Sequence, residues 1–348
     1  MNRTLLVIGD EKGYDTKEFL EKQPILEDRG IELKYTTYNE ILAGDMPDIQ
    51  NEYLMAHFFF PYSPWDEKIE TYTNGRFYGD NKFGKLFYDL MKSVEQKINI
   101  RYHNKELSYI NSPDLIIGDR DKEITRQRLI DNGIPVAKGY HPETARQLID
   151  IVNNSSNGGL YVKARNGSLS KGITLLTREK WLSNFRYDNS IDKIISKKAD
   201  CGWTFDEIDQ NPAFLDKLIK GGVVIENEIH TPVVDDKKFD LRFTFVLGEL
   251  VCYYPRTAPA GCAITNATPD NTPESLDFLE HIPSKAIEDA KDAATKAVHR
   301  LGYGFGGVDI IFNKDYSQFY VLELNAFPAT RTPKIHGFDP LEVLASNI

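Results

Sequence analysis

A segment near the C-terminus constrains the fold most, because its pattern is that of a β-hairpin. Two β-prone and largely apolar runs, residues 307–312 and 319–324, are separated by a short turn-forming stretch. An antiparallel hairpin of this length places Asp309 opposite Glu323. Side chains alternate between the two faces of a strand, so Glu323 and Asn325 share one face. We therefore expect three polar side chains to converge within an apolar strand pair.

The chemistry of these side chains indicates a cation site. Two facing carboxylates repel each other unless a cation or a proton lies between them. Magnesium prefers oxygen ligands and usually shares them with substrate phosphates. The pattern therefore predicts that Asp309, Glu323 and Asn325 bind Mg²⁺, with Mn²⁺ as the alternative ion. The competing interpretation is a solvated strand face with incidental acids. Apolar neighbours such as Ile310 and Leu324 weigh against it, because they indicate a buried context.

A loop rich in glycine, serine and lysine is the second candidate. Residues 164–172 lie between two β-prone arms, and Lys163 ends the first arm. Small residues let backbone N–H groups approach a phosphate, and lysines supply positive charge. The sequence lacks the G-x-x-x-x-G-K-[ST] spacing of a Walker A loop. A plain solvated hairpin loop is the alternative interpretation.

Two weaker patterns lie before and after this loop. Lys122 stands on a predicted helix that precedes Gly133-Ile-Pro, and a single lysine is uninformative by itself. The apolar run 223–229 contains two acids and is followed by Asp240 and Arg242. Such a strand could offer main-chain groups to an adenine and an acid to ribose hydroxyls. A strand with a charged end is the alternative.

The N-terminal part has the pattern of an open parallel sheet. Residues 5–9 form a strand-like run, residues 16–29 a helix-like run, and residues 31–38 a second β-prone run. This β-α-β order is typical of a parallel sheet. We place a domain boundary near Gly118. No G-x-G-x-x-G follows the first strand, which disfavours a dinucleotide-dependent dehydrogenase.

Composition excludes several classes of function. The 348 residues carry a formal net charge of −10, which argues against nucleic-acid and anionic-membrane binders because both need a basic face. No run of 18 apolar residues occurs, so we expect a soluble protein without membrane contact. The 3 cysteines form no C-x-x-C pair, and reduced thiols in a cytoplasmic protein are the expectation.

The order of these motifs resembles the ATP-grasp superfamily, over residues 119–348. Within it the chain looks most like ligases that add glutamate to a ribosomal protein, and like the glutathione synthetase and D-alanine–D-alanine ligase groups. The resemblance implies an α/β fold with α+β character in the C-terminal part, in which an N-terminal pre-ATP-grasp open parallel sheet precedes a two-lobed ATP-grasp domain. The expected domains are residues 1–118, 119–225 and 226–348.

The resemblance also implies roles for the matching residues. Those expected to bind the nucleotide or its metal are Lys122 and Lys163 (phosphates, and for Lys163 the adenine edge), Gly167 and Ser168 (a lid over the β- and γ-phosphates), Glu226 to Ile229 (adenine), Asp240 (ribose), and Asp309, Glu323 and Asn325 (magnesium). Those expected to stabilise the transferring phosphoryl group or hold the acceptor carboxylate are Arg242 and Arg256, with Asn266 as a loop asparagine.

Two positions depart from the family pattern. The D-alanine ligase group has an arginine two residues before the first metal acid, where this chain has Gly307. That departure shifts the expected anion-binding role towards Arg256. Many members have Pro-Gly after the metal asparagine, and here the pair is Pro328-Ala329. The turn that binds the acceptor should therefore differ in shape.

The implied activity is that of a carboxylate–amine ligase that uses ATP and Mg²⁺. Its substrates would be small-molecule or peptide carboxylates and amines, joined through an acyl phosphate, and a homodimer is a family-based expectation. Phosphoryl transfer needs placement and cations rather than a protein nucleophile, and the candidate residues are of those types. Two alternatives stay open: a kinase that stops after phosphoryl transfer, and a non-catalytic nucleotide-sensing module.

Overall fold

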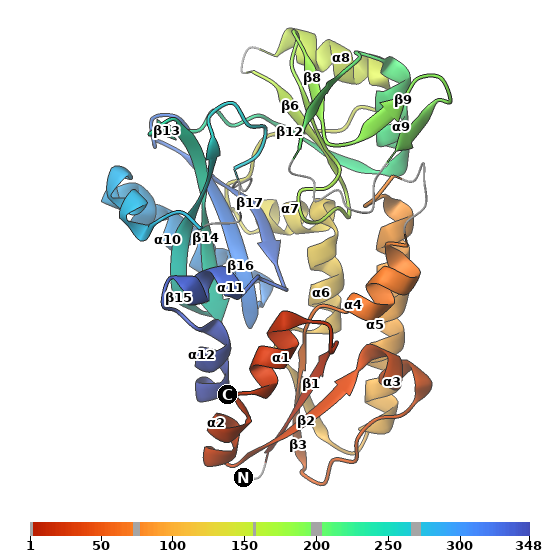
Figure 1. The fold of residues 1–348 in the computed structure, drawn as a ribbon, viewed down its shortest axis with the longest axis vertical. Coiled ribbons are helices and arrows are strands. Elements are labelled where there is room, and N and C mark those ends of the chain that lie inside the picture. The colour runs from red at the N-terminus through yellow and green to blue at the C-terminus, as the bar shows by residue number, and fades with distance from the viewer. Residues whose placement is uncertain (1–2, 72–76, 156–157, 196–203, 266–272) are drawn as a thin grey trace.

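The computed structural model describes residues 3–71, 77–155, 158–195, 204–265 and 273–348. Among these residues, three sheets of four or more strands form the framework. The first sheet lies at one end of the long axis, the second at the other end, and the third beside the helices that run between them (Figure 1). No described helix combines the length and the apolar character that a membrane span requires.

The first sheet is parallel throughout, as the N-terminal pattern predicts. Its strand order is β2-β1-β3-β4, with β1 (Arg3–Gly9), β2 (Ile31–Thr37), β3 (Tyr53–Phe58) and β4 (Glu106–Tyr109). The connecting helices are α3 (Tyr38–Ala43), α4 (Tyr62–Pro64), the π-helix η1 (Trp65–Ile69), α5 (Asn81–Arg101) and α6 (Pro113–Arg120). The strand β1 is buried almost along its whole length, as expected for a parallel strand covered on both faces.

The single helix predicted over residues 16–29 is wrong, because the chain forms two helices there. They are α1 (Tyr14–Leu20) and α2 (Gln23–Asp28). Pro24 lies in the first turn of α2, where its missing N–H costs nothing. A proline cannot continue a helix from the residues before it, so the chain breaks at this point. The apolar periodicity alone does not show this break.

The second sheet is antiparallel and carries the glycine- and serine-rich loop. Its order is β11-β8-β7-β6-β12-β5, with β5 (Gly139–Tyr140), β6 (Leu160–Ala164), β7 (Ile173–Leu176), β8 (Trp181–Ser183), β11 (Asp206–Ile208) and β12 (Val223–Asn227). The helices α8 (Ala145–Asn154) and α9 (Pro212–Gly221) bury apolar faces in the core of this sheet. A separate short pair consists of β9 (Arg186–Asp188) and β10 (Lys193–Ile195).

The third sheet contains the predicted hairpin. It is built from β13 (Val233–Val234), β14 (Lys237–Val246), β15 (Glu249–Pro259), β16 (Phe305–Phe312) and β17 (Phe319–Asn325), all antiparallel. The helices around it are α7 (Lys122–Asp131), the 3₁₀ helix η3 (Leu276–His281), α10 (Ser284–Leu301), α11 (Arg331–Ile335) and α12 (Pro340–Asn347). The predicted domain boundaries stay predictions; residue 118 lies within α6 and residue 225 within β12.

Candidate active site

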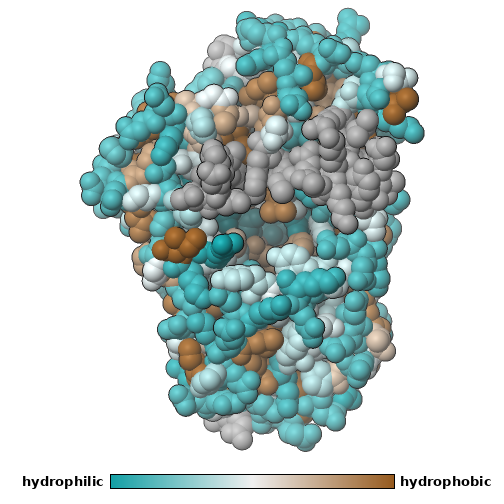
Figure 2. Space-filling view, in the orientation of Figure 1, coloured by the Kyte–Doolittle hydropathy of each residue, from teal (hydrophilic) through white to brown (hydrophobic). Residues whose placement is uncertain are grey.

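A cavity of about 810 Å³ opens between the second and third sheets. Figure 2 shows the face of the molecule hollowed at this level. Twelve of the predicted site residues line it: Lys122, Lys163, Gly167, Ser168, Glu226, Ile229, Asp240, Arg242, Arg256, Asp309, Glu323 and Asn325. Asn266 lies outside the described residues. The placement brings the candidates together, whereas their individual roles stay predictions.

The register of the terminal hairpin depends on one extra residue. At the turn end, Phe312 pairs with Phe319, and further along Asp309 pairs with Glu323. These two pairs are not in the same register, so Leu322 is the extra residue of a β-bulge. Without the bulge, Asp309 would face Leu322. The predicted pairing of Asp309 with Glu323 is therefore confirmed, and the bulge is what brings the two carboxylates together.

Asp309 is buried and is held by two arginines from neighbouring strands. Arg242 on β14 binds it through two nitrogens, with Nη2 3.0 Å from Oδ2, and Arg256 on β15 places Nη2 2.9 Å from the same oxygen. A Cβ atom at residue 307 would lie 2.9 Å from Nη1 of Arg242, so Gly307 leaves the space that this guanidinium fills. The departure from the family pattern at Gly307 therefore has a local physical reason.

A second buried carboxylate extends this cluster. Arg256 Nε lies 2.7 Å from Oδ1 of Asp240, and the hydroxyl of Thr265 donates to the other oxygen. Burial acts to lower the pKa of Arg256, but Asp240 and Asp309 outweigh it and raise that pKa well above its ordinary value. The guanidinium therefore stays charged between two acids. Asp240 already accepts two hydrogen bonds from protein groups, so the predicted ribose contact would add to an engaged carboxylate.

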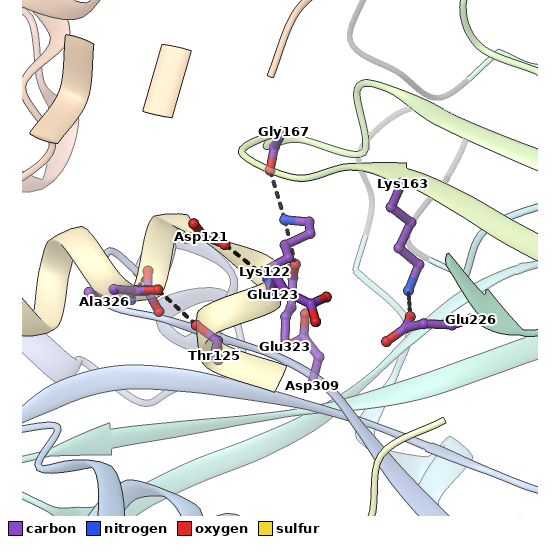
Figure 3. Close-up of polar contacts among 12 residues, drawn as sticks. Asp121, Lys122, Glu123, Thr125, Lys163, Gly167, Glu226, Asp309, Glu323 and Ala326 are labelled. Carbon is purple, nitrogen blue, oxygen red and sulfur yellow. Dashed lines mark hydrogen bonds and ion pairs between the residues drawn. The ribbon is translucent and has the colours of Figure 1, made fainter. Parts of the chain in front are cut away.

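Glu323 faces a lysine on the opposite side of the cavity. Lys122 Nζ lies 3.4 Å from Oε2 of Glu323 and donates to the carbonyl oxygen of Gly167 at 2.7 Å (Figure 3). Burial acts to raise the pKa of Glu323, but the charges of Lys122 and the two arginines outweigh it and lower the pKa to about 2. Glu323 is therefore ionised at neutral pH. Lys122 links this carboxylate to the loop between β6 and β7.

Lys163 and Glu226 form an ion pair between adjacent strands of the second sheet. Lys163 Nζ donates to Oε2 of Glu226 at 2.6 Å (Figure 3). Arg126 Nε lies 3.5 Å from Oε1 of the same carboxylate. Glu226 is only 7% exposed, so its charge needs these partners. Arg126 was not among the predicted residues. Its position four residues after Lys122 on α7, which puts both cations on one helix face, is the sequence signal that could have found it.

The loop between β6 and β7 is attached to the N-terminal third of the chain. The backbone N–H of Asn166 donates to the carbonyl oxygen of Gly79 at 2.8 Å, and Lys171 pairs with Glu70 at 2.9 Å. A Cβ atom at Gly79 would lie 2.6 Å from the backbone of Gly167, and this glycine has a φ of +79°. The loop therefore packs backbone against backbone at a position that only glycine fits.

The donor set at the hairpin fits a hard divalent cation. Asp309, Glu323 and Asn325 offer carboxylate and amide oxygens, the ligand type that magnesium prefers. The buried side-chain nitrogen of Asn325 has no hydrogen-bond partner among the described residues, so the amide group has capacity to bind a further group. No cluster of three or more His, Cys, Asp or Glu side chains in the described part of the chain is arranged to hold a metal. Any site here is therefore completed by an amide or by a ligand.

Comparison with solved structures matches the chain along its whole length. The ATP-grasp ligase PsnB, in complex with a phosphomimetic variant of its minimal precursor, Mg and ADP, aligns with a TM-score of 0.57 at 13% identity, covering 99% of this chain and 96% of PsnB. The chain has the ATP-grasp fold. The macrocyclase MdnC from Microcystis aeruginosa, bound with the precursor peptide MdnA, has a TM-score of 0.58 at 11% identity, covering 98% of each chain. D-cycloserine synthetase DcsG has a TM-score of 0.55 at 15% identity, covering 99% of this chain and 98% of DcsG.

No family model and no curated protein matches this sequence. The ATP-grasp fold is thus supported by structure rather than by sequence similarity. The expected subgroup, the ribosomal-protein glutamate ligases and glutathione synthetases, stays a prediction.

Proposed function

We propose that this ATP-grasp chain is an ATP-dependent ligase that joins a carboxylate to an amine. One observation carries the proposal: a single cavity gathers the oxygen donors of the terminal hairpin, lysines from α7 and β6, and the glycine- and serine-rich loop. These are the groups that bind and place a metal-bound triphosphate. Phosphoryl transfer needs that placement and positive charge more than it needs a protein nucleophile.

In the proposed reaction a carboxylate oxygen of the acceptor attacks the γ-phosphorus of ATP. ADP leaves and an acyl phosphate forms; the amine then attacks the acyl carbon, the C–O bond to phosphate breaks, and the amine loses a proton. Asp309, Glu323 and Asn325 would hold Mg²⁺. When bound, this ion would neutralise negative charge on the phosphates. Lys122 and Lys163 would contact the phosphates, and Lys163 also the adenine edge. The loop with Gly167 and Ser168 would exclude water from the acyl phosphate.

We assign Arg242 and Arg256 a positioning role. Both guanidinium groups are engaged with buried carboxylates, Asp309 for Arg242, and Asp309 and Asp240 for Arg256. Buried ion pairs of this kind fix the geometry of the groups they contain. We infer that the two arginines orient Asp309 towards the cation, and that contact with the transferring phosphoryl group is secondary. Glu226 to Ile229 would hold the adenine and Asp240 the ribose.

The substrate is proposed to be a peptide carboxylate. PsnB and MdnC are solved with precursor peptides, and a ligase associated with modified peptides from Chryseobacterium gregarium is solved with ADP and a leader and core peptide. A glutamate ligase acting on a protein, the subgroup expected from sequence, is a variant of the same chemistry. D-cycloserine synthetase shows that the fold also occurs in a protein named for a small-molecule product.

The test is turnover on a defined panel. The purified chain is incubated with ATP, Mg²⁺ and pools of acidic peptides and amino acids, and phosphate release and product mass are measured. A product lighter than its substrates by one water, with one phosphate released per bond, is expected. A stable phosphorylated product would instead establish the kinase alternative. Tight ATP binding without turnover on any pool would favour the nucleotide-sensing alternative.

A further inference from the structure

We propose that Arg120 binds the acceptor carboxylate, a role that rests on the proposed ligase function. Arg120 is the last residue of α6 and lines the cavity that holds the predicted nucleotide residues. It was not among the sequence-predicted residues. An arginine is suited to this role because its planar guanidinium matches a carboxylate with two parallel hydrogen bonds.

Aromatic rings of the first sheet's connections fix the guanidinium of Arg120 in place. Its Cζ lies 4.8 Å from the ring centre of Trp65, 5.5 Å from that of Phe87 and 5.6 Å from that of Phe60. Cation–π contacts of this kind hold the group by its faces. They leave the N–H donors of the guanidinium without a hydrogen-bond acceptor among the described residues, because a ring face is not a strong hydrogen-bond acceptor. The arginine is therefore held in place and still able to bind a ligand.

Arg120 is half-buried and makes no hydrogen bond or ion pair with any residue that the structure describes, unlike two other arginines of the cavity. Arg242 and Arg256 each contact at least one carboxylate directly. Their pKa values are raised because neighbouring acids outweigh burial, whereas burial lowers the pKa of Arg120 despite weaker attraction from nearby acids. An arginine remains protonated throughout. The charge of Arg120 is therefore the less compensated one, and an anion entering the cavity would neutralise it.

The acids nearest to Arg120 are engaged elsewhere. Asp119 accepts from the hydroxyl of Tyr303 at 2.6 Å and from the backbone N–H of Ala326 at 3.0 Å. Glu70 accepts from the indole N–H of Trp65 and pairs with Lys171 at 2.9 Å. These contacts keep both carboxylates from closing on Arg120, so neither pairs with it directly, and a bound anion would supply the partner that the described residues do not.

The same contacts place Arg120 next to the proposed reaction centre. Ala326 directly follows Asn325, so the bond from its N–H to Asp119 ties the end of α6 to the end of β17, which carries Glu323 and Asn325. Glu323 is close enough to Arg120 to act on it electrostatically. A carboxylate bound to Arg120 would therefore lie beside Glu323 and Asn325, the proposed cation ligands, where the γ-phosphate is expected.

Two other cations of the cavity are weaker candidates. Arg331 is exposed to solvent, so water already solvates its charge. Lys238 lines the cavity, but burial lowers its pKa, and a lysine can lose its proton where an arginine cannot. A purely structural role for Arg120, as a cation at the C-terminal end of a helix, is the competing explanation. Arg101 is the matched control, because it is the last residue of α5 and lies on the surface with Asp48 as its partner.

The experiment measures binding of a minimal carboxylate, so it does not require turnover. The probe is N-acetyl-glutamate N-methylamide, and its neutral counterpart is N-acetyl-glutamine N-methylamide. Both are titrated against the Mg-ADP-loaded chain by ligand-observed NMR, with the wild type, Arg120→Gln and Arg101→Gln. We expect Arg120→Gln to weaken the acid probe by about tenfold or more, the range for a hydrogen bond to a charged group, and to leave the amide probe unchanged. Arg101→Gln should behave as the wild type.

Equal affinity of wild type and Arg120→Gln for the acid probe would overturn the proposal. The affinities for ADP and for a non-hydrolysable ATP analogue are measured as well. If Arg120→Gln weakens binding of the ATP analogue but not of ADP, Arg120 is a γ-phosphate ligand and the proposal is overturned. Thermal unfolding of all three proteins identifies a structural effect, and Arg120→Lys supplies a folded variant if Arg120→Gln fails to fold. Failure of the ligase proposal shows as absent amide product with the wild type, independently of these titrations.

Discussion

The two walls of the cavity hold their charges differently. On the wall formed by β14–β17, the buried Asp309, Asp240 and Arg242 and the half-buried Arg256 are paired with one another. The second wall is built from α6, α7, β6 and the loop after β6, and it includes cations that are less fully paired. Lys122, for example, has a backbone carbonyl and a distant carboxylate as partners. The arginines of the first wall are neutralised by its own acids, whereas the second wall keeps positive charge for a ligand.

This difference suggests that the charges of the first wall fix the geometry of the site, whereas those of the second wall bind the ligand. Charges that are buried and paired cost several kcal/mol to uncover, so they keep one arrangement and set the direction of the groups beside them. Charges with weak or temporary partners exchange those partners for a ligand at small cost. We therefore expect substitutions on the first wall to affect stability and activity together, and those on the second wall to affect mainly activity.

The largest effect is expected for Asp309→Asn. It leaves two buried guanidinium groups without their shared carboxylate, which costs about 3–5 kcal/mol of stability. Turnover should also fall by about 10³-fold, the scale for losing one group that stabilises transition-state charge. Urea unfolding and phosphate release measure the two effects. Asp289→Asn, an exposed acid that pairs with Lys285 on α10, is the control and should change neither.

Glu323→Gln tests the boundary between the walls. Its Oε2 lies 3.4 Å from Nζ of Lys122, and its side chain is 36% exposed. The change in unfolding free energy should therefore stay within about 1 kcal/mol. Turnover should still fall by about 10²-fold, because one cation ligand is lost. Destabilisation as large as that of Asp309→Asn would mean that the two walls do not differ in the way described.

Lys163→Met tests the second wall, which is proposed to bind the nucleotide. The ion pair with Glu226 is lost, but Arg126 stays within reach of that carboxylate. We expect the Kd for ADP and ATP to rise by about tenfold, the range for one hydrogen bond to a charged group, with a small change in unfolding temperature. Calorimetric titration with each nucleotide measures it. An unchanged Kd for both nucleotides would remove Lys163 from the nucleotide site.

The smallest effect at neutral pH, and one confined to stability, is expected at His57, which does not line the cavity. This histidine is 1% exposed, neither ring nitrogen has a hydrogen-bond partner in the described structure, and burial lowers its pKa to about 3. The folded state therefore keeps His57 neutral while the unfolded chain takes up a proton near pH 6.5. Its contribution is present above pH 6.5 and is lost as the pH falls towards 3.

His57→Leu should remove this pH dependence. At pH 4.5 the variant should be more stable than the wild type by about 3 kcal/mol, and near pH 7 by about 1 kcal/mol or less. Turnover at pH 7 should not change. Unfolding free energies measured by urea at both pH values give the comparison, and parallel pH profiles for the two proteins would show that His57 does not titrate as described.

The sequence predicted the elements of the site better than the state of its charges. A hairpin over these residues predicted the pairing of Asp309 with Glu323, although the register at its turn end differs by one residue from the register at that pair. The parallel opening sheet follows from its β-α-β order. The bulge at Leu322 was not predictable, because nothing in the local residue types requires one extra residue there. Arg120 was missed for a related reason: its aromatic neighbours come from η1, α5 and the segment after β3, distant in sequence, and only folding brings them together.

The close approach of Gly79 to Gly167 has a consequence for the timing of the reaction. If the loop between β6 and β7 covers the nucleotide as predicted, it cannot move away without breaking its bonds to Gly79 and Glu70, which belong to the part of the chain built on the parallel sheet. Release of ADP would then require these contacts to Gly79, 87 positions before Asn166, to open first. A molecule that grips the N-terminal third could thus slow or hasten product departure without touching the phosphates.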